Sequence, residues 1–302
     1  MSDDLASLLA AGERAAFHGR PGAGIEPLQR AVAVAGAREL HTAATAARWL
    51  LAVCLSAAGR FGAAIEVLDE VVRVHDEDPV DRRTLAALGG STLASVHRQL
   101  GRHAQARAHD ELALTRSEGV GEAAFDALLG LAADAVGLGE REVARDNLES
   151  AAALVADRAE WWRQRVRLGW VRAEIALLET DPEAAIEAAG GAVDLAEHSG
   201  APRHVAKGLL FQGVAQIEAG RPEEAAATLR RGALLAESLG TLPLLWPARA
   251  VLGALLAGAH RDESARSLDS ARRAVDAIAA DLPDSLRAGW LARADVAALR
   301  EQ

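Results

Sequence analysis

The sequence predicts an all-α fold, a solenoid of about seven helix–turn–helix repeats that ends in a C-terminal capping helix. Three observations predict it: turn residues recur roughly every 40 residues, small residues flank each turn at fixed distances, and apolar residues between the turns follow a helical period. Alternating runs of Val, Thr or Tyr that would indicate strands are missing from the sequence. We expect a single solenoid domain over residues 1–302, with repeats near 3–37, 40–77, 80–118, 121–157, 159–199, 201–239 and 241–281 and a cap over 284–300.

Two repeats of the sequence align without a gap. The segment from Thr180, TDPEAAIEAAGGAVDLAEHSG, matches the segment from Gly220, GRPEEAAATLRRGALLAESLG, so that Pro182 pairs with Pro222. Other copies place the equivalent turn residue at Gly19, Gly59, Gly101 and Gly139, with Ala259 as a degenerate seventh.

Small residues lie five positions after each turn residue, and again twelve positions before these. Two helices that are joined by a tight turn can approach closely only where neither carries a bulky side chain, so we expect each pair at a helix crossing. The pairs are Gly12 and Gly24, Ala52 and Ala64, Ala94 and Ala106, Ala132 and Ala144, Ala173 and Ala185, Gly213 and Ala225, and, shifted by one position, Gly253 and Ser264.

The segments between the turns have the pattern of helices. Ile65, Leu68 and Val71 recur at three-residue steps on one helical face, and Pro182 follows Asp181 where a first helical turn is expected. We expect first helices near 3–18, 40–58, 80–100, 121–138, 159–179, 202–219 and 244–258, and second helices near 24–36, 62–76, 103–118, 141–156, 182–198, 222–238 and 262–280.

The composition excludes several classes of protein. The chain has 302 residues, half of them apolar, and a formal net charge of −10, which argues against direct binding of nucleic acid. Cys54 is the only cysteine and lies in an apolar run, so we expect a buried residue and no intrachain disulfide. The first residues are acidic, and no apolar run reaches the roughly 18 residues of a membrane span; both features favour a cytoplasmic protein.

Motifs of catalytic, metal and nucleotide sites are missing from the sequence, among them HExxH, GxGxxG, GxxxxGK[ST] and GxSxG. His97, His103 and His109 are six residues apart, which predicts scattered, solvated or locally bonded side chains. The run 75–78, His-Asp-Glu-Asp, precedes a proline and fits a helix end better than a metal site. The glycines of 89–92 fit a close helix contact better than a phosphate loop. We therefore expect no enzyme, no metal and no cofactor.

At this point the chain resembles the tetratricopeptide repeat family. The family pattern has a small residue in the first helix, Gly near the turn, a small residue early in the second helix, and Ala seven residues later. The repeat of about 40 residues is longer than the usual 34 and is similar to the helical arrays of MalT-type activators and kinesin light chains. The resemblance implies a right-handed α-solenoid whose first helices line a concave groove that binds proteins, peptides or small effectors. The last position of the pattern holds Ala31, Val71, Ala113, Ala151, Ala192, Gly232 and Ala271.

The resemblance also implies which side chains line that groove, counted from the small residue of each first helix. Arg167, Lys207 and Arg249 would form a basic strip on three successive helices, which suits a carboxylate-bearing ligand packed against Trp170 and Trp246. The alternative is that some of these Trp side chains fill the core between repeats. The candidate residues are Glu13, Phe17, Trp49, Arg98, Asp126, Arg167, Trp170, Glu174, Lys207, Glu218, Trp246 and Arg249.

Three functions remain open from the sequence. The first is a non-enzymatic scaffold or adaptor that binds a protein or peptide in its groove. The second is a sensor of a small effector or peptide that regulates transcription through a partner. The third is an enzyme on a solenoid scaffold, which would need titratable groups gathered in one pocket. Neither the identity of the partner nor the oligomeric state can be predicted from these patterns.

Overall fold

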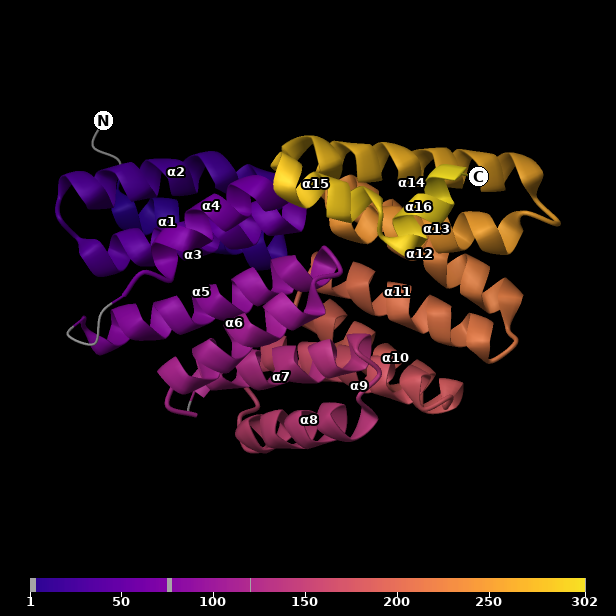
Figure 1. The fold of residues 1–302 in the computed structure, drawn as a ribbon, viewed down its shortest axis with the longest axis horizontal. Helices are drawn as coiled ribbons and strands as arrows, with labels where there is room; N and C mark the ends of the chain where they lie inside the picture. Colours follow the sequence, from indigo (N-terminus) through magenta and orange to yellow (C-terminus); the bar gives the residue numbers. More distant parts are fainter. Residues whose placement is uncertain (1–3, 75–77, 120, 302) are drawn as a thin grey trace. The chain divides into compact units, whose positions relative to one another are not determined.

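A computed structural model describes residues 4–74, 78–119 and 121–301, and all regular structure in these ranges is helical (Figure 1). The chain divides into two compact units, Met1–Ala159 and Glu160–Gln302, and each unit is described by itself. The all-α fold of helix pairs that the sequence predicts is confirmed. A single domain over the whole chain stays a prediction.

The first unit contains four helical hairpins, coloured indigo to magenta in Figure 1. Their helices are α1 (Leu5–His18), α2 (Gly22–Ala37), α3 (His41–Ala58), α4 (Phe61–Val71), α5 (Val80–Gln99), α6 (His103–Arg116), α7 (Gly121–Gly137) and α8 (Arg141–Val155).

The second unit contains three hairpins and a C-terminal pair of short helices. Its helices are α9 (Trp162–Leu178), α10 (Pro182–His198), α11 (Pro202–Glu218), α12 (Pro222–Leu239), α13 (Leu242–Leu256), α14 (Arg261–Asp281), α15 (Asp284–Leu291) and α16 (Ala294–Glu301).

Within each unit the first helices of the hairpins, which we name the A helices, contact one another. In the first unit α1 contacts α3, α3 contacts α5 and α5 contacts α7; in the second α11 contacts both α9 and α13. The second helices, named the B helices, pack against the A helix of their own hairpin and against the next A helix. The A helices therefore form a continuous layer, which is the arrangement that the repeat predicts.

The small residues at the helix crossings are all buried, as predicted. A Cβ added to Gly24 would lie 2.8 Å from Cys54 Sγ and 3.3 Å from the Gly12 carbonyl oxygen, so the backbones of α1 and α2 approach closely there. In the last hairpin Ser264 takes the small position, and its hydroxyl donates a 2.7 Å hydrogen bond to the Gly253 carbonyl. A larger side chain at these positions would separate the helices.

Most of the turn residues that define the repeat have a common backbone conformation, and Gly19, at φ −142°, is an exception. Gly59, Gly101, Gly139 and Gly220 have φ between 71° and 87°, in the left-handed region. Thr180 takes the same place in the fourth turn of this kind, at φ 63°, although a β-branched residue is strained there.

The structure departs from the predicted helices in two places. Helix α4 ends at Val71 rather than near residue 76, because the β-branched residues at its end have low helix propensity. Residues 75–77 of the run 75–78 lie outside the described part of the chain, and its last residue, Asp78, accepts a hydrogen bond from Arg82. The cap is two helices rather than one, since the chain leaves the helix around Arg293, whose guanidinium lies 5.4 Å from the Trp246 ring and 5.3 Å from the Trp290 ring.

Candidate functional site

Aromatic and cationic side chains meet on the A helices α9 and α11 of the second unit. Lys207 Nζ lies 4.6 Å from the centroid of the Trp170 ring and 5.6 Å from that of Phe211, within range of a cation–π interaction with both. Helical spacing produces this arrangement, because Lys207 and Phe211 are one turn apart on α11. Lys207 and Phe211 are half-buried, so one side of the pair is open to solvent.

His204 lies beneath this pair and joins the two helices. Its ring stacks on Trp170 with centroids 5.3 Å apart and meets the edge of Trp162 at 5.3 Å. Burial lowers the pKa of His204 well below its ordinary value, and the charges of Arg203, Arg163, Arg167 and Lys207 lower it further. His204 is therefore a neutral, fixed part of the site. We name Trp162, Trp170, His204, Lys207 and Phe211 the aromatic cluster.

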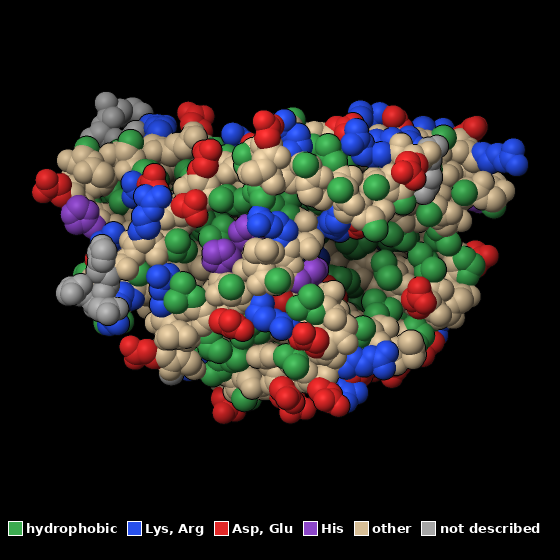
Figure 2. Space-filling model, viewed as in Figure 1, with side chains coloured by type: hydrophobic (Ala, Val, Ile, Leu, Met, Phe, Trp, Pro, Cys, Tyr) green, Lys and Arg blue, Asp and Glu red, His purple; other side chains and the backbone are tan. Residues whose placement is uncertain are grey.

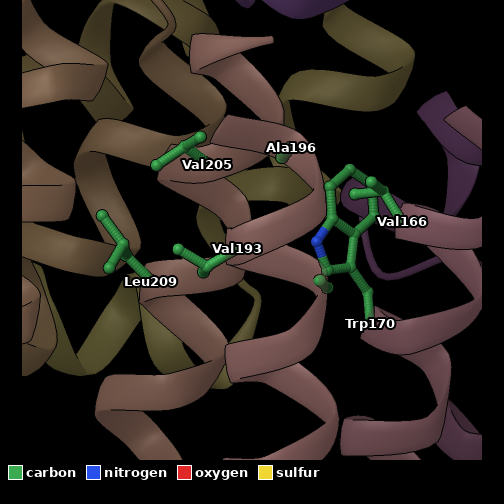
Figure 3. Close-up of a cluster of buried hydrophobic side chains, with 7 residues drawn as sticks. Val166, Trp170, Val193, Ala196, Val205 and Leu209 are labelled. Atoms are coloured by element: carbon green, nitrogen blue, oxygen red, sulfur yellow. The ribbon is translucent and has the colours of Figure 1, made fainter. Parts of the chain in front are cut away.

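A layer of buried aliphatic side chains supports the aromatic cluster. Figure 3 shows the Trp170 indole beside Val166 and turned toward Ala196, with Val193, Val205 and Leu209 also lining this core. The close packing depends on Gly208, where an added Cβ would lie 2.6 Å from Val193 Cγ2 and 3.6 Å from Trp170 Nε1. The indole is 5 % exposed, so its position is set by the core of the unit.

Two polar atoms of the aromatic cluster are buried without a hydrogen-bond partner among the described residues. They are Nδ1 of His204 and Nε1 of Trp170. A buried polar group without a partner costs about 1–3 kcal/mol, and such groups are rare in folded proteins. A hydrogen-bonding group that reached these two atoms would satisfy both of them.

The surface of the second unit carries exposed apolar side chains near these helices. Figure 2 shows hydrophobic side chains gathered over the helices that Figure 1 labels α11 to α13. Acidic and basic side chains alternate over most of the rest of this face.

The first unit contains a buried ionic network where its third and fourth hairpins meet. Arg98 on α5 donates to Asp110 on α6 at 2.7 Å, to both carboxylate oxygens of Asp134 on α7 at 2.8 and 3.0 Å, and to the Gly130 carbonyl at 3.0 Å. His103 Nδ1 lies 3.2 Å from Asp134 Oδ1. Both carboxylates are fully buried.

One guanidinium between two carboxylates leaves an excess of negative charge in this network. Burial raises the pKa of Asp110 to about 8, and the charge of Asp134 raises it as well, while Arg98 and Ser91 act in the opposite direction. Asp110 is therefore protonated near neutral pH. The carboxylates are buried and bonded to Arg98, so they do not face a surface where a substrate could bind. The network instead links helices α5, α6 and α7.

Two histidines beside the network overturn an expectation from the sequence. His97 on α5 and His109 on α6 stack with ring centroids 5.2 Å apart, so these two side chains meet instead of being scattered. Burial lowers the pKa of His97 to about 4, with smaller effects from His109 and Arg102, and burial also lowers the pKa of His109. The sequence spacing missed this contact because it joins α5 to α6 across a turn.

The other candidate residues of the first unit do not gather at one place. Trp49 donates from Nε1 to the Thr92 hydroxyl at 3.1 Å and packs on the core of Ala87, Leu88 and their neighbours. Glu13 is exposed and Phe17 half-buried on α1, and Asp126 is buried on α7.

The remaining candidate residues of the second unit are used in different ways. Trp246 is buried and packs edge-to-face against Trp290 on α15, with ring centroids 5.8 Å apart. The cap therefore covers this side chain, which agrees with the alternative that some Trp residues fill the core. Arg249 forms a 2.7 Å ion pair with Glu237. Glu174 is half-buried on α9, Arg167 is half-buried beside the aromatic cluster, and Glu218 is exposed at the end of α11.

Several residues of the site were not among the candidates from the sequence. Arg163, Arg203 and Phe211 each lie four residues from a candidate, and His204 lies three residues before Lys207, so helical spacing alone would have found them. The pattern of a cation at i and i+4 occurs on both α9 and α11, with Arg163 and Arg167 on one helix and Arg203 and Lys207 on the other.

Metal binding and membrane insertion find no support in the described residues. No group of three or more His, Cys, Asp or Glu side chains in these ranges could hold a metal ion. None of the described helices is both long enough and apolar enough to cross a bilayer.

The fold is similar to that of several solved structures. No family model and no curated protein matches the sequence. A Rap protein complexed with competence and sporulation factor matches with a TM-score of 0.68 at 12% identity, over 98% of this chain and 80% of that one. NprR in complex with its cognate peptide NprX matches with a TM-score of 0.58 at 14% identity, over 99% and 82%. Aspartyl phosphate phosphatase F from Bacillus subtilis matches with a TM-score of 0.52 at 12% identity, over 100% and 83%. At these identities the likeness shows a shared helical repeat fold.

Proposed function

We propose that this protein is a non-enzymatic scaffold or adaptor that binds a peptide, or a peptide segment of a partner protein, on its A helices. The observation that carries the proposal is the aromatic cluster on α9 and α11, where Trp, Phe and Lys side chains are held rigidly at a partly open surface. Large aromatic faces with a few polar groups are typical of peptide-binding sites. Two similar folds were solved with a bound factor or peptide, which supports the same use here.

Binding explains the structure better than catalysis does. The Arg98 network gathers several titratable side chains, but its two carboxylates are fully buried and bonded to the guanidinium. An active site needs titratable groups that face a substrate, and this network does not provide them. One similar fold is named a phosphatase, but a likeness at 12% identity supports only the fold.

We further propose that the repeats are of the tetratricopeptide type, in the long form found in MalT-type activators and kinesin light chains. The paired small residues at each helix crossing and the left-handed turn residues support this assignment.

A second candidate function is a sensor that regulates transcription through a partner when a small effector or peptide binds. The buried polar atoms of His204 and Trp170 favour it, because a ligand that completes their hydrogen bonds would stabilise one arrangement of α9 and α11. A sensor would melt at a higher temperature when its ligand is added, whereas a scaffold would form a stable complex with a partner protein.

The proposed function is tested by selecting peptides from a random display library with the full-length chain. We expect selected peptides, once synthesised, to bind saturably in a fluorescence anisotropy titration. Phe211→Ala should weaken that binding about tenfold, as loss of an aromatic contact does. Leu234→Ala, which removes an exposed side chain from the B helix α12, serves as the control and should leave affinity unchanged. Failure to select any peptide that binds saturably would refute the proposal.

A further inference from the structure

One junction between hairpins has charged side chains at positions where the other repeats have uncharged ones. Asp110 lies four positions after the small residue of its B helix and is fully buried. A buried charge costs free energy unless it is paired, so a carboxyl group at an aliphatic position of the repeat calls for an explanation. The other six repeats have Leu or Ala at this position, namely Leu28, Leu68, Leu148, Ala189, Leu229 and Leu268.

The two residues that pair with each other beside Asp110 also depart from the repeat. Arg98 lies four positions after the small residue of its A helix, and the other six repeats have no charged residue there. Asp134 lies two positions after the small residue of α7. In the first hairpin this position holds Arg14, which is exposed. The other five repeats have an apolar residue, namely Cys54, Val96, Ile175, Ala215 and Leu255.

Helix α7 has a gap that receives the carboxyl group of α6. A Cβ added to Gly130 would lie 2.0 Å from Asp110 Oδ2, so a larger residue would collide with it. The junction between α4 and α5 also has a glycine gap, at Gly89, but an apolar side chain fills that one, since an added Cβ would lie 2.5 Å from Val71 Cγ1. The contact between α6 and α7 is therefore polar where a comparable contact is apolar.

The other end of the same junction is apolar. One buried cluster joins the first half of α5, the last turns of α6 and the first half of α7, and it consists of Ala87, Leu88, Ala113, Ala123 and Ala127. Leu88 and Arg98 are ten residues apart on α5, which is about 15 Å along a helix. We name the apolar cluster the apolar end of the junction and the Arg98 network its ionic end.

The two ends differ in what opening of the junction would cost. At the apolar end, separation of the helices would expose aliphatic surface to water, which is unfavourable. At the ionic end, water would solvate the separated charges and so offset the loss of their hydrogen bonds. The side chains of Arg98 and His103 are 20% and 25% exposed, so water already reaches the edge of the network. Since neighbouring hairpins are held by their shared interface, we expect this interface to open at its ionic end first.

We propose that the junction between the third and fourth hairpins is a hinge, in which the apolar end is the pivot and the Arg98 network is a latch that opens and closes. Opening separates Asp134 on α7 from Arg98 and His103 on the third hairpin and lets water solvate all three. Closing restores the hydrogen bonds that fix the angle between the two hairpins. The hinge lies on α5, α6 and α7, so it does not rest on the function proposed for the aromatic cluster.

Hydrogen exchange of the full-length chain at neutral pH tests the hinge by comparing the two halves of α7. Amides of 131–137 lie beside the latch, and amides of 125–129 lie beside the pivot. A helix that loses its packing at one end frays at that end. We therefore expect the amides of 131–137 to exchange about tenfold faster than those of 125–129.

A variant that gives the latch the character of the other repeats distinguishes hinge opening from ordinary fraying. Arg98→Met, Asp110→Leu and Asp134→Leu together replace the charged groups by apolar side chains of similar shape. A buried ion pair is often less stabilising than apolar residues of the same volume, so exchange of 131–137 should slow about tenfold in this triple variant. Fraying that does not involve the latch would keep its rate.

Two further variants complete the comparison. Arg107→Met with Glu140→Gln removes a more exposed ion pair from α6 and should leave the exchange of α7 unchanged. Arg98→Met alone leaves Asp134 buried without the guanidinium, so it should speed exchange of 131–137 about tenfold and leave 125–129 nearly unchanged. This single variant tests the hinge even if the triple variant does not fold, and circular dichroism checks the helices of each protein.

Three results would overturn the hinge. The first is equal exchange in the two halves of α7 in the wild type. The second is a folded triple variant in which exchange of 131–137 is not slowed. The third is equal acceleration of both halves in Arg98→Met, which would show that the network stabilises the whole junction instead of latching one end.

Discussion

Thr180 is the residue at which the repeat pattern and local backbone chemistry conflict. It occupies a turn position where other repeats have Gly, and its φ of 63° is unfavourable for a side chain with a branched Cβ. Thr180→Gly should therefore raise the free energy of unfolding by about 1 kcal/mol. Urea denaturation followed by circular dichroism measures the change. Thr180→Ala keeps a Cβ, so it should raise the free energy of unfolding less than Thr180→Gly does. An equal increase in the two variants would show that backbone strain is not the cause.

Ala225 shows how the size of one residue sets the distance between two helices. It is fully buried on α12, which packs against α11, and a Cβ added to Gly213 of α11 would lie 2.6 Å from Leu229 Cγ, one turn further along α12. Ala225→Leu should lower the free energy of unfolding by about 1–3 kcal/mol, because an overpacked crossing forces the helices apart. Ala227→Leu is the control, since Ala227 is exposed on the same helix. Equal stability of the two variants in urea would contradict the close-crossing interpretation.

At the scale of elements, the Arg98 network links α5, α6 and α7 and makes their stability depend on pH. The pKa of Asp110 is raised from 3.8 to about 8 by burial, so its carboxyl binds a proton in the folded state over a range where the unfolded chain releases it. A raised pKa stabilises the fold fully below pH 3.8, and this stabilisation is lost as the pH rises toward 8.

The corresponding prediction concerns the slope of stability against pH. Asp110→Asn mimics the neutral acid, so between pH 6.5 and 8 the unfolding free energy of the variant should fall less, or rise more, with pH than that of the wild type. His97, whose pKa is lowered to about 4, acts the other way, because its stabilisation is lost as the pH falls below 6.5, and the lowered pKa values of His109 and His204 act in the same direction as His97. Because both proteins contain these histidines, the difference between their slopes in urea denaturation reports the effect of Asp110. An unchanged slope in the variant would assign the pH dependence to other groups.

The cap is the second element with a testable role. Trp290 on α15 is 1 % exposed, packs on Trp246 and donates from Nε1 to the Val275 carbonyl at 3.3 Å. Terminal caps protect the open end of a helical array, so Trp290→Ala should destabilise the second unit by about 3–5 kcal/mol. Thermal unfolding measures the loss, with Leu234→Ala as a surface control. A loss below about 1 kcal/mol would mean that the cap contributes little.

The helices were predictable from the sequence where local signals define both ends. Helix α10 was expected over 182–198 and is observed over Pro182–His198, because Pro182 fixes the first turn and Gly200 follows the last. Helix α4 ends earlier than predicted because its β-branched end has low helix propensity, and the sequence has no turn residue there to mark the end.

The site was only partly predictable, because contacts between repeats depend on side chains far apart in the sequence. Spacing placed Trp170 and Lys207 on adjacent A helices, and the structure brings them together. Helical spacing did not predict the hydrogen bond from Arg98 to Asp134 in the next hairpin, or the packing of Trp246 against Trp290 of the cap. Each of these contacts is decided by the packing of a later element, which periodicity within one helix does not describe.

At the scale of the whole molecule, the contacts within each unit are those of a repeat protein. Each helix packs on its neighbours in the array, so stability is carried by local interfaces and a ligand on two helices protects those helices first. The peptide site proposed here belongs to one unit and to its A helices, α9 and α11.

Hydrogen exchange of the full-length chain, with and without a peptide selected from the display library, tests that location most directly. We predict slower exchange of amides in 162–178 and 202–218, the ranges of α9 and α11, with little change in the B helices α12 and α14. Protection confined to the B helices, or to the first unit, would contradict a binding site on the aromatic cluster.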